Sequence, residues 1–343
     1  MTAPLLQRFV WLIALLAFAT MPLPATDAPP NDLKFGSVSL TTENDKYLAG
    51  TDRYYTNGFK LSALSAPLSN FTDEEVPAPV RWIASQLTSL VPAGHDAKLG
   101  LSLGQNIYTP SDIHTPTPNP ADRPYAAWLY VGAAFQSYDL ADGTLDTLDV
   151  QVGMVGPAAL GEKIQNGVHD IIHVRHALGW SHQIHNEPGL VLAYTRKWRF
   201  ETEGAHTGLG ADLIPHAGLS LGNAFTYANA GLATRIGWRL PADFGTDLIH
   251  PSGDSNSDRP GLGVHIFGAV DGRAVARDIT LKGNSFRDSA SVTKKNFVVD
   301  LQIGLAVGDK TWQLTYSQAV RTKEFNGQAH DDNFGSISVS FYY

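Results

Sequence analysis

The chain has 343 residues, a formal net charge of −8 and no cysteine, and 43% of its residues are hydrophobic. The negative charge argues against a nucleic-acid partner, which would be held by a basic surface. The lack of cysteine excludes disulfide bonds and thiolate metal sites. Many glycines (32) and aromatic residues (15 Phe, 12 Tyr and 7 Trp) favour strands and turns.

The N-terminus is typical of a secretory signal peptide. Arg8 precedes an uninterrupted apolar run, residues 9–19, that is too short to span a bilayer, and small residues follow it. We therefore divide the chain into a signal peptide, residues 1–28, and a single domain, residues 29–343. The domain contains no apolar run of about eighteen residues. The exported protein is thus either soluble or crosses a membrane as strands.

Alternation of apolar and polar residues predicts about twelve strands of roughly ten residues, the length that a tilted strand needs to cross a bilayer. An even number of strands would place both chain ends on the same side of the membrane. In chain order the predicted strands are residues 35–43, 54–64, 99–108, 125–138, 145–155, 190–200, 209–221, 226–240, 261–270, 296–307, 311–320 and 334–343.

The last predicted strand illustrates the pattern. Ile337, Val339 and Phe341 alternate with Ser336, Ser338 and Ser340. An apolar face toward lipid and a small polar face toward a barrel interior would explain this alternation. We predict an all-β fold, an antiparallel transmembrane β-barrel of about twelve strands with a short helix in an extracellular loop. A soluble β-sandwich, which alternates in the same way, is the alternative.

Two connections interrupt the strands. Residues 71–95 include VRWIASQLTSLV, which predicts either an amphipathic helix at the membrane surface or a packed loop. Residues 240–261 are rich in Pro, Gly, Ser and Asp and predict a long loop.

One stretch, residues 153–189, has helical periodicity. Gln165 and His169 are four residues apart, so they share one face of the predicted helix. We infer that this helix forms one wall of an active site. The apolar residues that recur at three- and four-residue spacing are Leu160, Ile164, Val168, Ile171 and Ile172.

Barrel parity would bring distant residues to one rim. If the N-terminus is periplasmic, the extracellular connections are residues 44–53, 109–123, 157–188, 271–295 and 322–333. Together with the start of the second strand, these connections contain most of the unusual polar residues. The candidates are Asn44, Asp45, Thr56, Asp122, Arg123, Gln165, His169, Arg175 and Glu324.

These residue types suggest ester hydrolysis. Carboxylate, amide and hydroxyl oxygens are hard ligands that suit Ca²⁺, and a histidine can act as general base on water. A cation beside an ester carbonyl would polarise it and stabilise the oxyanion. A Ser-His-Asp triad is a weaker alternative, because no serine has a distinctive setting in the sequence. A transition-metal site is a further alternative, although its candidate residues match no H-E-x-x-H pattern; they are His173, His176, His182 and His185.

A series of short motifs keeps its order from one end of the mature chain to the other. The motifs are Glu43-Asn44-Asp45, Tyr55-Thr56-Asn57-Gly58, residues 105–111 (QNIYTPS), residues 122–126 (DRPYA), Val155-Gly156-Pro157, residues 165–169 (QNGVH), Gly179-Trp180, Gln183 and residues 322–325 (TKEF). With these motifs the chain resembles the outer-membrane lipid A 3′-O-deacylases.

The resemblance implies a twelve-stranded barrel in the Gram-negative outer membrane, inserted by the barrel-assembly machinery. Its site would face the outer leaflet, between the outer wall and a helix from an extracellular loop. Members of the family remove the 3′-acyloxyacyl chain of lipid A, the lipid part of lipopolysaccharide, in a Ca²⁺-dependent hydrolysis. Carried over, His169 would be the base, and Asn44, Asp45, Thr56 and Gln165 would hold the calcium and orient the substrate.

Two positions depart from the family pattern. The family has a Lys after the Tyr-x-Pro-Ser stretch, where this chain has residues 112–116 (DIHTP), and a Glu shortly after the helical His, where this chain has His173-Val174-Arg175. Arg123 or Arg175 could supply the missing positive charge. The departures keep two alternatives open: a non-catalytic barrel that serves as a pore or surface-binding protein, and an esterase that acts on phospholipids.

Overall fold

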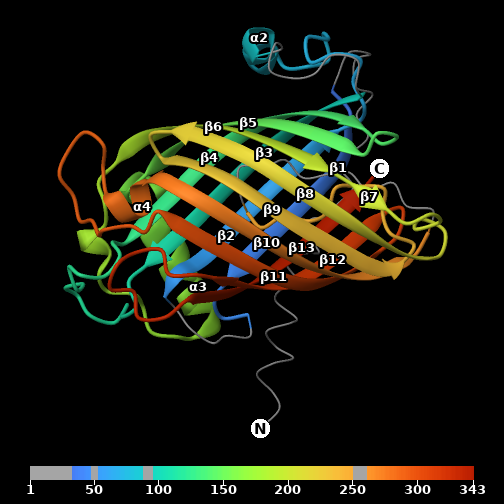
Figure 1. Cartoon of the computed structure of the whole chain (residues 1–343). Helices are drawn as coiled ribbons and strands as arrows, with labels where there is room; N and C mark the ends of the chain where they lie inside the picture. The colour runs from blue at the N-terminus through green and yellow to red at the C-terminus, as the bar shows by residue number, and fades with distance from the viewer. Residues whose placement is uncertain (1–32, 48–52, 88–95, 250–260) are drawn as a thin grey trace.

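The structure is a computed structural model that describes residues 33–47, 53–87, 96–249 and 261–343. The predicted signal peptide lies outside these residues. Within them, one antiparallel sheet of thirteen strands closes into a barrel, because β1 pairs with β13 and β6 pairs with β8 (Figure 1). The strands are β1 (Phe35–Asn44), β2 (Tyr54–Ser65), β3 (Asp96–Thr109), β4 (Ala126–Asp139), β5 (Thr144–Val155), β6 (Glu187–Trp198), β7 (Phe200–Glu201), β8 (Leu209–Gly222), β9 (Phe225–Trp238), β10 (Gly263–Asp278), β11 (Phe297–Gly308), β12 (Trp312–Arg321) and β13 (Asp332–Tyr342).

Twelve of these strands form the barrel wall, and the two-residue β7 is an extra strand beside β8. The predicted twelve-stranded antiparallel barrel is therefore confirmed. Most predicted boundaries differ by no more than three residues, and the largest error is in the strand predicted at residues 261–270, which continues to Asp278. Asp271 and Arg273 face the barrel interior in this part of β10, and Gly272 between them supplies no large apolar residue, so the sequence lacks the alternation of a strand there.

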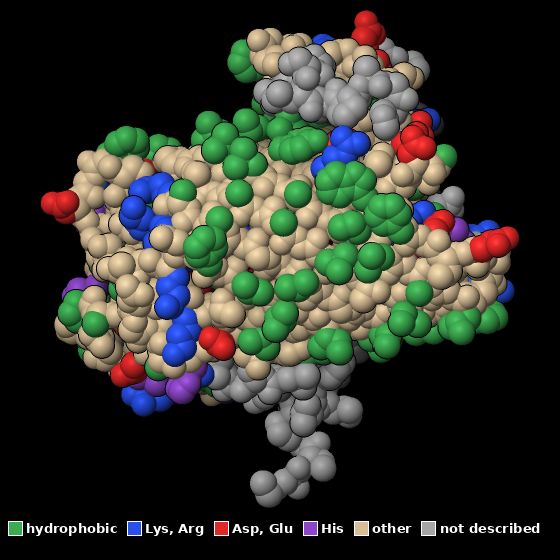
Figure 2. Space-filling model, viewed as in Figure 1, with side chains coloured by type: hydrophobic (Ala, Val, Ile, Leu, Met, Phe, Trp, Pro, Cys, Tyr) green, Lys and Arg blue, Asp and Glu red, His purple; other side chains and the backbone are tan. Residues whose placement is uncertain are grey.

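The two faces of the wall differ as a membrane barrel requires. On the outer face large apolar side chains are exposed, such as Val131 (58%), Ile266 (59%) and Ile303 (68%). Figure 2 shows hydrophobic side chains spread over the barrel wall. Inside, Ser39 Oγ donates to Ser340 Oγ at 2.7 Å, which confirms that the serine face of the last strand points inward.

The helices lie outside the sheet. The helix α3 (Gly161–Ile172) follows β5, and α4 (Ile279–Lys282) follows β10 at the same end of the barrel, called the α3 end here (Figure 1). The short 3₁₀ helices η2 (Pro157–Ala159) and η3 (Trp180–His182) flank α3. Among the described residues, no helix is both long enough and apolar enough to cross a membrane.

The helix expected near residue 80 is α2 (Ala78–Leu87). Ala84 is buried in a cluster with Phe71, and the Phe71 ring packs edge-on against Phe135 of β4 at 5.4 Å. Trp82 is 68% exposed. A short helix is thus present, and the last residues of the predicted stretch, 88–91, lie outside the described part of the chain.

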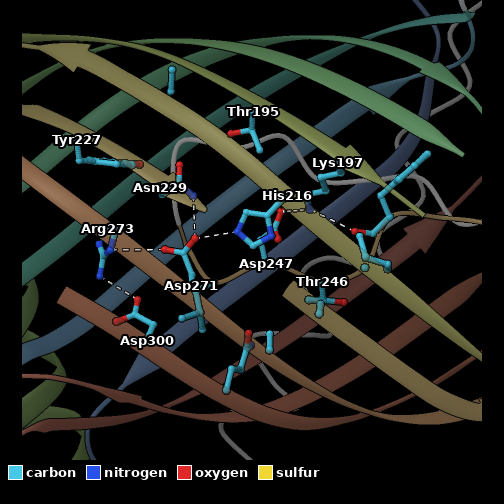
Figure 3. Close-up of a pocket in the computed structure, with 18 of the residues that line it drawn as sticks. Thr195, Lys197, His216, Tyr227, Asn229, Thr246, Asp247, Asp271, Arg273 and Asp300 are labelled. Atoms are coloured by element: carbon cyan, nitrogen blue, oxygen red, sulfur yellow. Dashed lines mark hydrogen bonds and ion pairs between the residues drawn. The ribbon is translucent and has the colours of Figure 1, made fainter. Parts of the chain in front are cut away.

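The connection between β9 and β10 is a loop, as predicted, but its described part lies inside the barrel. This luminal segment, residues 240–249, buries Phe244 and Leu248. Lys197 of β6 donates through Nζ to the Phe244 carbonyl at 3.2 Å and to Asp247 Oδ2 at 2.6 Å. In Figure 3, Asp247 lies beside Lys197 and His216 within the ring of strands. Apolar side chains and paired charges therefore fill much of the lumen.

Candidate active site

The helix α3 lies against the outer wall of β3 and β4. Side chains alternate along β3: Asn106 and Tyr108 face the lumen, where Asn106 Nδ2 donates to Tyr55 Oη at 3.0 Å. Ile107, between them, therefore faces outward. It is buried in a cluster with Ala159 of η2 and with Trp180 of η3. The structure thus places the predicted helix on the lipid side of the wall.

Two contacts seat α3 on the wall. Gln105 of β3 donates through Nε2 to the Ala159 carbonyl at 2.5 Å, just before the helix begins. At Gly161 the helix approaches so closely that a Cβ would lie 2.5 Å from the Trp180 ring and 2.7 Å from the Ala127 Cβ. Only glycine fits there, and its small size sets how near the helix comes to β4.

The buried face of α3 is its polar one. Gln165 and His169 are each 3% exposed, whereas Ile164 is 44% and Ile171 is 63% exposed. In a water-soluble protein the apolar stripe would face the core. Here the apolar stripe is exposed on the outside of the barrel, as the apolar side chains of the outer wall are. The polar pair is buried between the helix and the barrel wall. The sequence predicted that the pair shares a face, and the structure shows which way that face points.

The His169 ring is oriented by a backbone carbonyl. The helix ends at His173, in a left-handed conformation with φ of 55°. The chain then turns back, so that His169 Nδ1 lies 2.7 Å from the carbonyl oxygen of Arg175. Because a carbonyl can only accept, Nδ1 carries the proton and Nε2 keeps the lone pair in the neutral ring. Nothing in the sequence marks this carbonyl.

Gln165 is oriented by an aromatic side chain. Trp180 donates through Nε1 to Gln165 Oε1 at 2.8 Å, and both side chains are buried. The Trp180 ring also packs on Tyr125 at 4.9 Å. The Gly179-Trp180 motif therefore holds the glutamine, a role that its position in the sequence alone did not reveal.

Asn44, Asp45 and Thr56 lie at the ends of β1 and β2. Asp45 is fully buried, and its Oδ2 accepts from the Arg53 amide at 2.6 Å. The Thr56 and Thr109 hydroxyls lie 2.6 Å apart, and Thr109 is the last residue of β3. The helix α3 also packs on β3, so each group of candidates has a contact with this strand. Thr109 itself was not predicted.

The oxygens at these strand ends fit a hard cation. They are one carboxylate (Asp45), one amide (Asn44) and two hydroxyls (Thr56 and Thr109), which is the oxygen chemistry that Ca²⁺ prefers. Among the described residues no group of three or more His, Asp or Glu side chains could hold a metal, so the transition-metal alternative gains no support. His176, for example, pairs with the exposed Asp170 at 2.6 Å.

Arg123 and Arg175 have different surroundings. Arg123 is completely buried and donates to Glu324 Oε2 at 2.9 Å and to Thr280 Oγ1 at 3.1 Å. Its guanidinium also stacks 4.6 Å from the centre of the luminal Tyr108 ring. The Arg175 side chain is exposed. The contacts of Arg123 are thus luminal, and only Arg175 is close along the chain to the helix on the outer wall.

Comparison with known proteins gives a clear family. The family model described as outer membrane protein LpxR matches residues 10–343. The chain belongs to the LpxR family. Among solved structures, LpxR from Salmonella typhimurium is 22% identical with a TM-score of 0.71, over 90% of this chain and 100% of that one. The beta domain of the Bordetella autotransporter Brka covers the same shares at 11% identity and a TM-score of 0.44. Comparison with curated proteins gives no match.

Membership in the LpxR family assigns the protein to the Gram-negative outer membrane. The likeness to the Salmonella protein confirms the barrel, and at this identity it speaks for the fold alone. The family, the fold and the location predicted from the sequence are therefore confirmed.

Proposed function

We propose that this LpxR-family protein is a lipid A deacylase that hydrolyses the 3′-acyloxyacyl ester of lipid A. The observation that carries the proposal is the orientation of α3. Gln165 and His169 are buried against the outer wall, while the apolar face with Ile164 and Ile171 is exposed. A reactive polar pair beside an exposed apolar surface suits a substrate whose acyl chains lie in the membrane.

His169 would act as the general base. Its Nδ1–H is held by the Arg175 carbonyl, so Nε2 is the nitrogen that takes a proton from the attacking water. This backbone carbonyl orients the ring, as a carboxylate often does for a catalytic histidine. Gln165, held through Oε1 by Trp180, would orient the ester with its amide nitrogen.

Asn44, Asp45, Thr56 and Thr109 would hold Ca²⁺. A bound Ca²⁺ would polarise the ester carbonyl and stabilise the oxyanion. Arg175 is the arginine whose side chain is exposed near the helix, so we assign to it the positive charge that the absent family Lys would supply. We assign no such role to the luminal Arg123.

The remaining alternatives are less well supported. An open pore conflicts with a lumen occupied by residues 240–249, which are anchored to β6 through Lys197. A phospholipid esterase would use the same residues, so only the substrate distinguishes it from a lipid A deacylase. We expect the partner to be lipopolysaccharide of the outer leaflet, reached after insertion by the barrel-assembly machinery.

The test is a mass spectrum of lipid A from cells that express the wild type, His169→Ala or His176→Ala. The exposed His176 is the matched control on the same connection. We expect loss of one acyloxyacyl unit with the wild type and with His176→Ala, and a rate lower by about 10²–10⁴-fold with His169→Ala. Unchanged lipid A with folded, heat-modifiable wild type would refute the proposal. Purified protein given phospholipid and lipid A in parallel would decide the substrate class.

A further inference from the structure

The luminal segment reaches the α3 end of the barrel and binds there to a buried carboxylate. The amide of Ile249 donates to Glu43 Oε1 at 2.8 Å. Glu43 is 1% exposed and immediately precedes Asn44 and Asp45. The described part of the loop between β9 and β10 thus contacts, through its last residue, the strand that leads to the candidate calcium ligands.

Glu43 in turn connects three neighbouring strands. Its Oε2 accepts from Tyr55 Oη of β2 at 2.7 Å, and the same oxygen of Tyr55 accepts from Asn106 Nδ2 of β3 at 3.0 Å. We call the four linked residues, Ile249, Glu43, Tyr55 and Asn106, the luminal brace. All four are buried or nearly so, which makes each hydrogen bond costly to lose.

The brace lies directly behind the candidate active site. Successive side chains along a regular strand point to opposite faces, so Asn44, after Glu43, and Gln105, before Asn106, belong to the outer face of the wall. Thr56 follows Tyr55 at a β-bulge, and its hydroxyl lies 2.6 Å from that of Thr109, which follows the luminal Tyr108. Two of these neighbours are proposed site residues, and the third, Gln105, seats α3 through the Ala159 carbonyl.

The luminal segment that supports the brace is itself firmly held. Asp247 pairs with Lys197 at 2.6 Å, and the Asp243 carbonyl accepts from Arg199 Nη1 at 2.9 Å. Arg235 bridges Asp243 and Asp212, with all three side chains buried. Leu248 joins a core cluster with Tyr55. The support therefore begins near the end of the barrel opposite α3 and ends behind the site.

We propose that Glu43, held by the Ile249 amide, is a positioning residue that sets the spacing of the β1, β2 and β3 ends for catalysis. The inference rests on the proposed deacylase function. Without the brace the ends of these strands lose their common anchor, and a displacement of about 1 Å at a reacting group lowers a rate by about 100-fold. The exposed apolar face of α3 is untouched, so we expect the effect on kcat rather than on KM.

The experiment measures kcat and KM for lipid A with purified wild type and variants in Ca²⁺. We expect Glu43→Leu to lower kcat by at least about tenfold with KM within about twofold. Glu43→Gln keeps an acceptor for the Ile249 amide and should stay within about threefold of wild type. Ile249→Pro removes the amide proton and should match Glu43→Leu. Asp142→Leu, an exposed acid in the turn between β4 and β5, is the control with unchanged kcat.

A double variant tests whether the two residues act through one contact. Glu43→Leu with Ile249→Pro should lose no more activity than either single change, because both remove the same link. Multiplied losses, a Glu43→Gln variant as slow as Glu43→Leu, or wild-type kcat in Glu43→Leu would each overturn the proposal. If Glu43→Leu fails the heat-modifiability test for folding, Tyr55→Phe replaces it, since it removes only the hydroxyl between Glu43 and Asn106 and should lower kcat likewise.

Hydrogen exchange gives a readout that does not depend on activity. We expect faster backbone exchange at residues 43–45 and 54–57 in Glu43→Leu and Ile249→Pro, but not in Glu43→Gln or Asp142→Leu. Unaltered exchange at these residues would overturn the brace even if the enzyme is active. A wild type that leaves lipid A intact would instead refute the proposed function, and exchange alone would then decide whether the brace exists.

Discussion

The His169 ring donates from Nδ1 to the carbonyl oxygen of Arg175 at 2.7 Å, six residues further along the chain. The contact exists because the helix ends in a left-handed turn at His173 that returns the chain over its last turn. A backbone acceptor fixes the tautomer of the ring whatever side chain stands at position 175. The family glutamate that this chain lacks near its helical histidine is therefore not needed to orient the ring.

Arg175→Ala separates the two roles of this residue. The variant keeps the carbonyl that orients His169 and removes only the exposed guanidinium. We expect kcat for lipid A to fall by about tenfold, a loss of about 1.4 kcal/mol of transition-state stabilisation, with the pH profile unchanged. An equal loss in Arg175→Lys, measured in the same assay, would contradict a role for the charge.

Arg123→Leu should act on stability. The change leaves Glu324 buried without the partner at 2.9 Å and exposes no new surface, so we expect the barrel to lose about 3–5 kcal/mol of unfolding free energy. Urea titration of the purified protein in detergent measures this loss. Arg175→Leu, at an exposed position, should stay within about 0.5 kcal/mol of wild type. Equal stabilities for the two variants would contradict the luminal role of Arg123.

Gly161 and Gly167 offer a matched pair on α3. A side chain at Gly161 would collide with Trp180 and Ala127, whereas a Cβ at Gly167 meets nothing within 4 Å. We expect Gly161→Val to push the helix off the wall and lower lipid A hydrolysis by at least about 100-fold in a folded barrel. Gly167→Val should leave the rate within about twofold. The seating of α3 would be unimportant for catalysis if both variants kept full activity.

Trp180→Phe removes the donor to Gln165 and keeps an aromatic ring against Tyr125. A buried amide oxygen without its partner costs about 1–3 kcal/mol, so we expect kcat to fall by about tenfold or more while the barrel stays folded. The control is Trp82→Phe, at an exposed position in α2. Equal rates for the two variants would remove Trp180 from the site.

Asp45→Asn tests the cation. Asp45 is the only carboxylate among the four proposed ligands, and cation affinity depends strongly on ligand charge. We expect chelation with EDTA to abolish activity in the wild type, and we expect Asp45→Asn to need at least about tenfold more Ca²⁺ for half-maximal rate. Asp331→Asn, at an exposed position before β13, should titrate like wild type. Activity that survives EDTA would exclude a Ca²⁺-dependent reaction.

Local sequence patterns were enough for the strands because alternation arises from the pleat of each strand and the contrast between lipid and interior. The dependence on this alternation also explains the boundary error in β10. Asp271 and Arg273 look like loop residues in the sequence, and only the closed wall shows that Arg273 pairs with Asp300 and that Asp271 contacts His216. The four-residue spacing of Gln165 and His169 likewise predicted a shared helix face.

The sequence by itself determined the barrel and the helix after the fifth strand, since the spacing of apolar and polar residues along the chain indicates both, and it proposed the residues of the candidate site. Only the tertiary structure decided that the polar face of α3 is buried against the outer wall of the barrel. It also decided that Arg123 pairs with Glu324 and that residues 240–249 enter the lumen and contact Glu43. These contacts join residues up to 206 positions apart. Closure of the sheet brings such residues together, and the local spacing of polar and apolar residues does not indicate which distant side chain each one will contact.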